Sequence, residues 1–221
     1  MKDDKEETDP FEHATPEKRY VAFVDVLGFG AQVLNDFNNA FATYREILKN
    51  WRWHYEFSAD VPARIYSDAI LLTSEHLGKL IGAVVTLNMV TLMGDCLIRG
   101  GIGWGQHIEV ADGSNFYVVS EALTEAVQIE KTVKWPCVAL SDKIAIPSHW
   151  WNPSVRNIER GILYFNGLTL VNPLTLSWGQ SAQTRVCQLS NTYPEYQSKY
   201  DWFLKLTDAI FCDEPLVPKR Y

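Results

Sequence analysis

Long apolar runs, paired cysteines and an excess of positive charge are all missing from this chain of 221 residues. No apolar segment reaches the ~18–20 residues that a membrane span requires. No basic region followed by an apolar stretch opens the sequence, so a secretory signal is not expected. The net charge of −7 argues against a broad nucleic-acid surface or a polybasic membrane contact. We therefore expect a cytoplasmic protein whose partners include neither nucleic acid nor a membrane.

The four cysteines are scattered and contain no Cys-x-x-Cys pair. This spacing is typical of small buried residues in a reduced, cytosolic protein, and not of zinc ligands or a disulfide framework. Hydrophobic residues make up 47% of the chain and aromatic residues 13%, which is enough for one core with disorder confined to the ends. We predict a flexible acidic tail over residues 1–18, a core over 19–146, and an extension of the same domain over 147–221.

Hydrophobic patterning divides the core into an ordered series of strands and helices. The sequence RYVAFVDVLGFG begins as a strand buried on both faces and breaks at Gly28 and Gly30. A helical segment to about Trp53, a hairpin over Arg64–Glu75, a deeply buried helix over Leu77–Met93 and the strand LIRGGIGWGQHIEV follow. This order is typical of the ferredoxin-like βαββαβ plan. We therefore predict a mixed α/β (α+β) fold with a C-terminal hairpin and helices.

Turn and cap residues indicate the remaining elements. Asp112 and Gly113 mark a turn, and Ser120 is placed to cap a helix over SEALTEAVQIEK. Asn166 and Gly167 are typical of a tight turn between two alternating strands. The residues that follow this hairpin are predicted to be mostly helical.

Two aspartates stand where strands normally exclude charge. Asp25 lies at the end of the first strand, and Asp68 interrupts the apolar hairpin RIYSDAILLTSE. Each has an ordinary explanation, Asp25 as a helix cap and Asp68 as a turn residue. In a βαββαβ sheet, however, the first strand and this hairpin are neighbours, so the two carboxylates are expected to face one another. Facing carboxylates repel unless a cation lies between them, and oxygen ligands with phosphates favour Mg²⁺ or Mn²⁺.

Glycines near the first aspartate add an indication of phosphate chemistry. Gly28 and Gly30 free the backbone between strand and helix, where N–H groups can hold phosphate oxygens. The run GGIGWG (Gly100–Gly105) lacks the strand-then-helix context of a nucleotide-binding loop, and close packing of the strand explains it better.

Three motifs in register resemble those of class III nucleotidyl cyclases. FVDVLGFG is similar to their first metal motif, RIYSDAILL to the hairpin of their second, and IRGGIGWG to their Arg-x-Gly-Ile-x-x-Gly strand. Order and spacing agree across about Tyr20 to Ser141, so 19–146 is expected to be the catalytic core. Within this superfamily, the chain resembles the bacterial pyrimidine cyclases of the Pycsar anti-phage system in three features. These are Ser-Asp in place of Gly-Asp in the second motif, RGGI on the later strand, and a C-terminal helix with KYDWF after a VNP segment.

The resemblance implies an enzyme that converts UTP to 3′,5′-cyclic UMP and diphosphate with two Mn²⁺ or Mg²⁺ ions, with CTP as the alternative substrate. It also implies a homodimer with active sites at the interface, and a separate effector that the cyclic nucleotide activates downstream, whether or not the two proteins bind. The matching positions are Asp25, the Val26 carbonyl and Asp68 for metal, Leu27, Gly28, Phe29 and Gly30 for the triphosphate, and Arg64 and Tyr66 for the base.

Two of these assignments have alternatives. Arg64 falls where purine cyclases place a base-recognising lysine, and it could bond a pyrimidine edge or pair with an acid at the end of the sheet. Tyr66 could narrow the base pocket or be an ordinary strand aromatic.

The later helix departs from the family pattern. An Asn and an Arg of the family match Thr124 and Gln128 here, so neither role transfers. Charge that develops on the phosphates still needs a cation, and Arg99 is the candidate by elimination, unless it bridges a dimer interface. The missing pair keeps open a second function, a cyclase-fold module that senses nucleotide without turning it over. A diguanylate cyclase ranks last because its Gly-Gly-Asp/Glu-Glu-Phe hairpin is absent.

Overall fold

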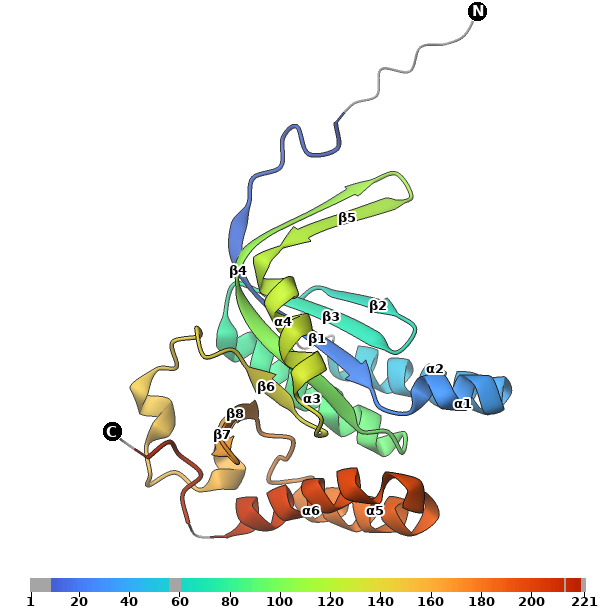
Figure 1. Cartoon of the computed structure of the whole chain (residues 1–221), viewed down its shortest axis with the longest axis vertical. Coiled ribbons are helices and arrows are strands. Elements are labelled where there is room, and N and C mark those ends of the chain that lie inside the picture. The colour runs from blue at the N-terminus through green and yellow to red at the C-terminus, as the bar shows by residue number, and fades with distance from the viewer. Residues whose placement is uncertain (1–8, 56–60, 213, 220–221) are drawn as a thin grey trace, which may run out of the picture.

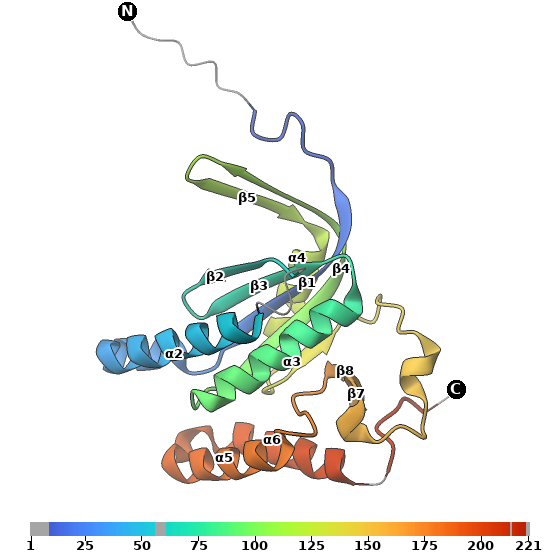
Figure 2. The same ribbon diagram turned by 180° about the vertical axis from the view of Figure 1, so that it is seen from behind.

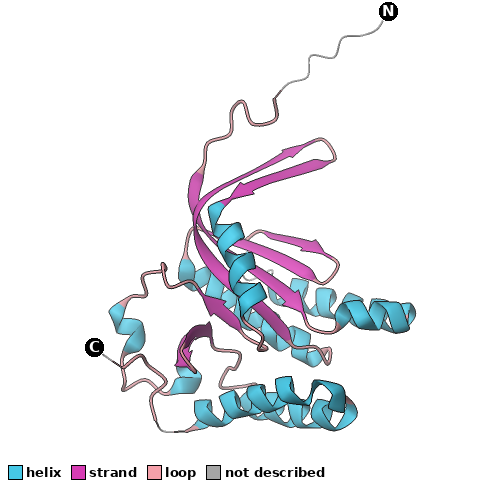
Figure 3. Ribbon diagram, in the orientation of Figure 1, coloured by secondary structure: helices cyan, strands magenta, loops and turns pink. Residues whose placement is uncertain are grey.

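The computed structural model describes residues 9–55, 61–212 and 214–219. Eight strands form one mixed sheet in the order β2-β3-β1-β4-β6-β8-β7, and β5 pairs with the outer part of β4 (Figures 1 and 3). The strands are β1 (Glu17–Val26), β2 (Ala63–Tyr66), β3 (Ala69–Ser74), β4 (Ile98–Asp112), β5 (Asn115–Ser120), β6 (Val138–Leu140), β7 (Ile162–Phe165) and β8 (Leu168–Val171). The helices are α1 (Phe29–Asn35), α2 (Phe37–Tyr55), α3 (Leu77–Met93), α4 (Glu121–Thr132), α5 (Gly179–Thr192) and α6 (Gln197–Phe211).

The first four strands have the ferredoxin-like order, which confirms the predicted fold class. β1 lies between β3 and β4 and is antiparallel to both. Helix α3 covers one face of the sheet and α4 the other (Figures 1 and 2). Val24 belongs to the cluster that contains Leu80 of α3, and Val21 to the cluster that contains Ala122 of α4. The first strand is apolar along its length because both of its faces are covered.

Helix α3 is apolar on nearly every side because it is buried on nearly every side. Leu80, Val84 and Leu87 have no exposed surface, and the helix packs against the sheet as well as against α2 and α5. Within the described ranges, no helix combines the length and apolarity needed to cross a membrane.

Glycines of β4 allow α4 to pack directly on the strand backbone. A Cβ added to Gly103 would lie 2.2 Å from the carbonyl oxygen of Ala122, and one added to Gly101 would lie 2.3 Å from that of Ala126. Such distances are far below ordinary contact, so only a residue without a side chain fits. This confirms that GGIGWG serves close packing.

Two local features differ from the sequence prediction. The long helical segment predicted to about Trp53 is two helices, because Asp36 has the non-helical values φ −150° and ψ 87°. The Asp36 carboxylate accepts a hydrogen bond from the backbone amide of Asn39 at 3.1 Å, and this bond caps the second helix. Strand β5 was not predicted; with the outer part of β4 it forms a two-stranded arm that extends over β2 and β3 (Figure 1).

The C-terminal segment continues the sheet and then adds a helical pair. The predicted hairpin turn is confirmed, with φ of 50° at Asn166 and 81° at Gly167, and β8 pairs with β6 of the core. Helices α5 and α6 pack on each other. The buried Asn157 amide donates to three carbonyls within 209–214, which joins the end of α6 to the hairpin region. The division at residue 147 stays a prediction.

The predicted acidic tail falls partly outside the described residues, since 1–8 are not among them. The part that is described packs on the protein: the ring of Phe11 lies edge-on to Tyr117 of β5, with centroids 5.8 Å apart. Strand β1 begins at Glu17, slightly before the predicted start of the core at residue 19.

Candidate active site

Asp25 and Asp68 lie together at one end of the sheet. Asp25 is the penultimate residue of β1 and stands opposite Ala69 of β3. Asp68 comes immediately before Ala69, in the turn that joins β2 to β3. The Val26 amide donates to the Asp68 carbonyl oxygen at 3.0 Å, which fastens this turn to the end of β1. Antiparallel pairing thus brings together two acids that are distant in the sequence, as the strand order predicts.

The two carboxylates interact electrostatically. The pKa of Asp25 is raised above its ordinary value of 3.8, mainly by burial and next by the negative charge of Asp68. The pKa of the Tyr44 hydroxyl is also raised, by burial and then by Asp68. Arg99 and Lys199 lower the pKa of Asp25 without overcoming these effects. The acid pair is therefore incompletely neutralised by the chain, an environment that favours a bound cation.

The turn that carries Asp68 is strained at Ser67. The φ of Ser67 is 54°, a left-handed value that residues other than glycine seldom adopt, and the matching position of the cyclase motif is glycine. On the facing side, a Cβ added to Gly30 would lie 3.7 Å from the Asp68 carboxylate. The strained turn therefore places this carboxylate against the beginning of α1. Strain of this kind costs about 1–3 kcal/mol and is concentrated at functional sites.

Arg99 has two acidic partners in this chain. It stands opposite Asp25 in the β1–β4 register, with its Nη2 atom 3.4 Å from the Asp25 Oδ2 atom. It also forms an ion pair with Glu130 of α4, a residue that is only 6% exposed. Sequence reasoning missed Glu130, although it shares one buried helix face with Ala122 and Ala126. A charged residue on an otherwise apolar face was the available signal.

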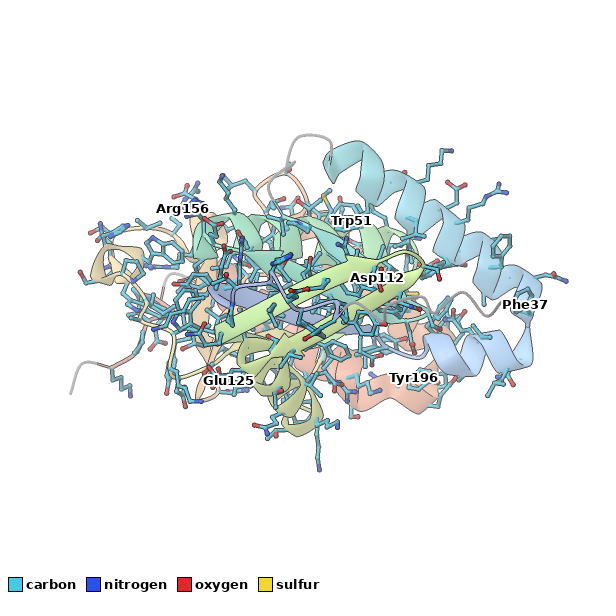
Figure 4. All side chains as sticks on the ribbon, turned by 90° about the horizontal axis from the view of Figure 1, so that it is seen from above. Phe37, Trp51, Asp112, Glu125, Arg156 and Tyr196 are labelled. Carbon is cyan, nitrogen blue, oxygen red and sulfur yellow. The ribbon has the colours of Figure 1, made fainter. Side chains whose placement is uncertain are left out.

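A cleft opens beside the glycine turn that follows β1. Leu27, Gly28 and neighbouring residues of α1 form one wall, and residues of the α5–α6 connection and of the start of α6 form the other. A Cβ added to Gly28, whose φ is 81°, would lie 4.0 Å from the Tyr196 ring. Figure 4 shows Tyr196 where the C-terminal helices meet α1. The C-terminal wall, including Tyr196 and Lys199, was not identified from the sequence because no local pattern links it to β1.

The four residues predicted to contact a triphosphate occupy different surroundings. Leu27 and Gly28 line the cleft, and Gly30 lies next to Asp68. Phe29 is only 5% exposed, and its ring packs on Tyr44 with centroids 5.1 Å apart. The Phe29 side chain therefore belongs to the core, and any contact that this residue makes with phosphate would come from its backbone.

Arg64 is engaged by the β4–β5 arm. Its Nη2 atom lies 3.3 Å from the Glu109 Oε1 atom, and its guanidinium lies 4.7 Å from the centre of the Phe116 ring. The pKa of Glu109 is lowered by a hydrogen bond from His107, against an opposing effect of burial, and further by the charge of Arg64. Of the two alternatives for Arg64, this geometry corresponds to pairing with an acid. Tyr66, at the end of β2, is 57% exposed.

Comparisons with known proteins identify relatives by fold alone. No protein-family model matches the chain, and no curated protein sequence matches it. The guanylyl cyclase domain of the RhoGC fusion protein from the aquatic fungus Blastocladiella emersonii aligns with a TM-score of 0.50 and 19% identity, over 58% of this chain and 82% of that one. The adenylyl cyclase CyaB from P. aeruginosa aligns with a TM-score of 0.49 and 13% identity, over 59% and 79%. The guanylyl cyclase Cya2 gives 0.48 and 12%, over 72% and 92%.

The chain has the fold of a class III nucleotidyl cyclase domain. An identity this low transfers the arrangement of strands and helices, and it does not transfer a substrate. The chemistry open to this chain follows from the residues that the cyclase fold holds in place.

The helix that is expected to carry an Asn and an Arg from the resemblance to class III cyclases has neither of them here. Thr124 and Gln128 stand at the matching positions of α4 and line a shallow hollow together with Lys143. The Thr124 hydroxyl donates to the Ser120 carbonyl at 2.8 Å, and the Lys143 ammonium lies 2.9 Å from Glu125. Neither Thr124 nor Gln128 supplies a positive charge.

The acid pair of this cyclase fold suits a hard divalent cation. Among the residues with described positions, no cluster of three or more His, Cys, Asp or Glu side chains is placed to hold a metal ion. Mg²⁺ sites in phosphate-transferring enzymes commonly use only one or two carboxylates, and substrate phosphates and waters complete the coordination. Asp25 and Asp68 provide that number, next to the Val26 carbonyl. The raised pKa of Asp25 supports the fit, because a cation between the carboxylates would remove their repulsion.

Proposed function

We propose that this protein is a metal-dependent nucleotide cyclase that converts UTP to 3′,5′-cyclic UMP and diphosphate. The observation that carries the proposal is the pair Asp25 and Asp68, held side by side at the end of adjacent strands in a cyclase fold. Burial and mutual repulsion make the pair unfavourable in the free protein. A fold that maintains such a pair, with a strained turn at Ser67, is best explained by a cationic ligand.

In the reaction, the ribose 3′-oxygen bonds to the α-phosphorus, and the bond from the α-phosphorus to the bridging oxygen breaks. Diphosphate leaves with that bridging oxygen, and the 3′-hydroxyl proton passes to solvent. Two Mg²⁺ or Mn²⁺ ions bound by Asp25, Asp68 and the Val26 carbonyl would lower the pKa of the 3′-hydroxyl and neutralise charge on the departing diphosphate. The protein supplies position: the strained turn holds Asp68, and Glu130 keeps Arg99 paired when Asp25 is engaged by a ligand.

The choice of UTP rests on the resemblance to pyrimidine cyclases, with CTP as the alternative. Arg64 and Tyr66 are proposed at the base end of the site. Arg64 contacts Glu109 in the free protein and would exchange this contact for the base when nucleotide binds. The cyclic nucleotide would act as a messenger in anti-phage defence by activating a separate effector.

We further propose a homodimer with active sites at its interface. Exposed apolar side chains support this: Leu34 is 89% exposed, Phe37 64% and Phe41 54%. The rings of Phe37 and Phe41 are stacked with centroids 6.2 Å apart. Figure 4 shows Phe37 at the outer end of α2, next to α1. Exposed apolar groups of this kind mark contact surfaces. A monomeric mass in light scattering at every protein concentration would argue against the dimer.

The direct test is product analysis. The full-length protein is incubated with each of the four ribonucleoside triphosphates and Mn²⁺, and the products are identified by chromatography and mass. We expect cyclic UMP and diphosphate from UTP, and a loss of about 100-fold or more in Asp68→Asn, since an electrostatic contact in the transition state is removed. Asp112→Asn is the matched control, because Asp112 is exposed at the end of the arm (Figure 4). It should retain wild-type activity.

A second function is favoured by one observation, the uncharged Thr124 and Gln128 on α4. Tight nucleotide binding without release of diphosphate would support a nucleotide-sensing module and refute the enzyme. Cyclic CMP as the main product would change the substrate to CTP. Equal activity in Asp68→Asn and wild type would show that Asp68 has no role in the reaction.

A further inference from the structure

The C-terminal helices form one side of the cleft at the glycine turn. From the core come residues at the end of β1 and in α1, among them Leu27 and Gly28. From the C-terminal extension come Tyr193, Glu195, Tyr196, Lys199 and Tyr200. The contact is close, since the Tyr196 ring lies 4.0 Å from the Cβ position of Gly28. The extension therefore contributes directly to the cavity beside the glycine turn, whose nearest lining residue, Leu27, follows Asp25 by two positions in the chain.

Lys199 is the ammonium group in this cleft. Its Nζ atom lies 5.2 Å from the centre of the Tyr196 ring, in a cation–π contact. Across the described part of the chain, no carboxylate forms an ion pair with Lys199, whereas Asp95, also on the cleft, is paired with Arg185 at 2.8 Å. Glu195 is exposed at the edge of the cleft. The positive charge of Lys199 is therefore available to a ligand.

The other cationic group near the acid pair is already engaged. Arg99 contacts both Asp25 and Glu130, and α4 offers the uncharged Thr124 and Gln128. Lys199 lines the same cleft as Leu27 and Gly28, the residues that follow the proposed metal-binding end of β1. A polyanion that enters the cleft beside the glycine turn would meet the Lys199 ammonium first.

We propose that Lys199 binds the phosphates of the nucleoside triphosphate, so that the C-terminal extension completes the phosphate pocket of the core. The identity of the ligand rests on the proposed function. Tyr196 positions the ammonium beside Gly28, and the charge-assisted contact provides what Thr124 and Gln128 do not. Diphosphate carries the same groups and binds at the same place.

The test measures binding as well as turnover in the full-length protein. Inorganic diphosphate with Mg²⁺ is titrated by calorimetry into wild type, Lys199→Met, Lys199→Arg and Lys205→Met. Lys205 is an exposed lysine on the same helix and serves as the matched control. Loss of a charged hydrogen bond predicts binding weakened about 10- to 100-fold in Lys199→Met, with recovery in Lys199→Arg and no change in Lys205→Met.

Thermal unfolding of each variant checks that it is folded, and Lys199→Gln replaces Lys199→Met if that variant is not. If wild type forms no cyclic nucleotide but binds diphosphate through Lys199, the proposed function fails and this inference stands. If wild type is a cyclase, and Lys199→Met matches Lys205→Met both in diphosphate affinity and in the rate of cyclic nucleotide formation, the inference is overturned and the function stands. Absence of diphosphate and nucleotide binding in wild type overturns both.

Discussion

Replacing Gly103 with alanine would force α4 away from the sheet. The added Cβ would lie 2.2 Å from the carbonyl oxygen of Ala122 and 3.1 Å from the amide nitrogen of Ala126. Ordinary contact begins at 3.4 Å, so the difference of 3.4 − 2.2, about 1.2 Å, has to come from movement of the helix. Because these are backbone atoms of a helix, no side-chain rotation can relieve the collision.

The expected loss of stability is at the upper end of overpacking effects. Such substitutions typically cost about 1–3 kcal/mol, and a collision with backbone should cost about 3 kcal/mol in the free energy of unfolding. At roughly 2–4 °C per kcal/mol for a chain of this length, the melting midpoint falls by about 6–12 °C. Activity should fall as well, because α4 carries Glu130, the partner of Arg99 beside Asp25. A misplacement of about 1 Å can lower a rate about 100-fold.

Urea unfolding followed by circular dichroism measures the change, and Gly82→Ala is the matched control. Gly82 lies within α3, and no atom lies within 4 Å of its Cβ position. The same substitution should therefore stabilise the protein there by about 0.5–1 kcal/mol, because alanine is the better helix former. The two variants are expected to change stability in opposite directions.

A Gly103→Ala protein with a free energy of unfolding within about 0.5 kcal/mol of wild type would refute the packing argument, since overpacking costs more than this. Equal losses in Gly103→Ala and Gly82→Ala would show that the effect is not specific to the strand–helix contact. Full activity in a destabilised Gly103→Ala protein would show that the position of α4 does not affect the site.

Two further predictions concern ionisable groups. Because the folded-state pKa of Asp25 is raised above 3.8, its protonation stabilises the metal-free fold below that pH, and this contribution is lost as pH rises through the raised pKa. In the presence of a chelator, the free energy of unfolding of Asp25→Asn should thus exceed that of wild type by a growing amount as the pH rises from acid to neutral. Urea unfolding at several pH values measures this difference, and a difference that does not change with pH would contradict the prediction. Ellman's reagent should titrate the two exposed thiols of the native protein and all four after unfolding, and early reaction of the buried pair, whose pKa values are about 12, would contradict the fold. The exposed pair is Cys187 and Cys212, and the buried pair is Cys96 and Cys137.

Local sequence was sufficient where a pattern reports its own surroundings. The apolar run before Asp25 indicated a strand covered on both faces, and Asn166-Gly167 indicated a tight hairpin. Asp68 could be placed beside Asp25 because the order of elements fixes which strands are neighbours in a βαββαβ sheet. The acid pair of the candidate site thus follows from the sequence and one topological rule.

The tertiary structure alone decided which side chains meet across distant elements. Glu130 pairs with Arg99, Glu109 pairs with Arg64, and Lys199 faces the cleft at Gly28. Each contact depends on how a helix or an arm packs against the sheet, and spacing along the chain carries no record of that packing. The sequence by itself determined the order of the four strands β1 to β4 and the pair of acids. The surrounding charges, on which the proposed binding of a triphosphate depends, were decided by the way the helices and the arm pack against that end of the sheet.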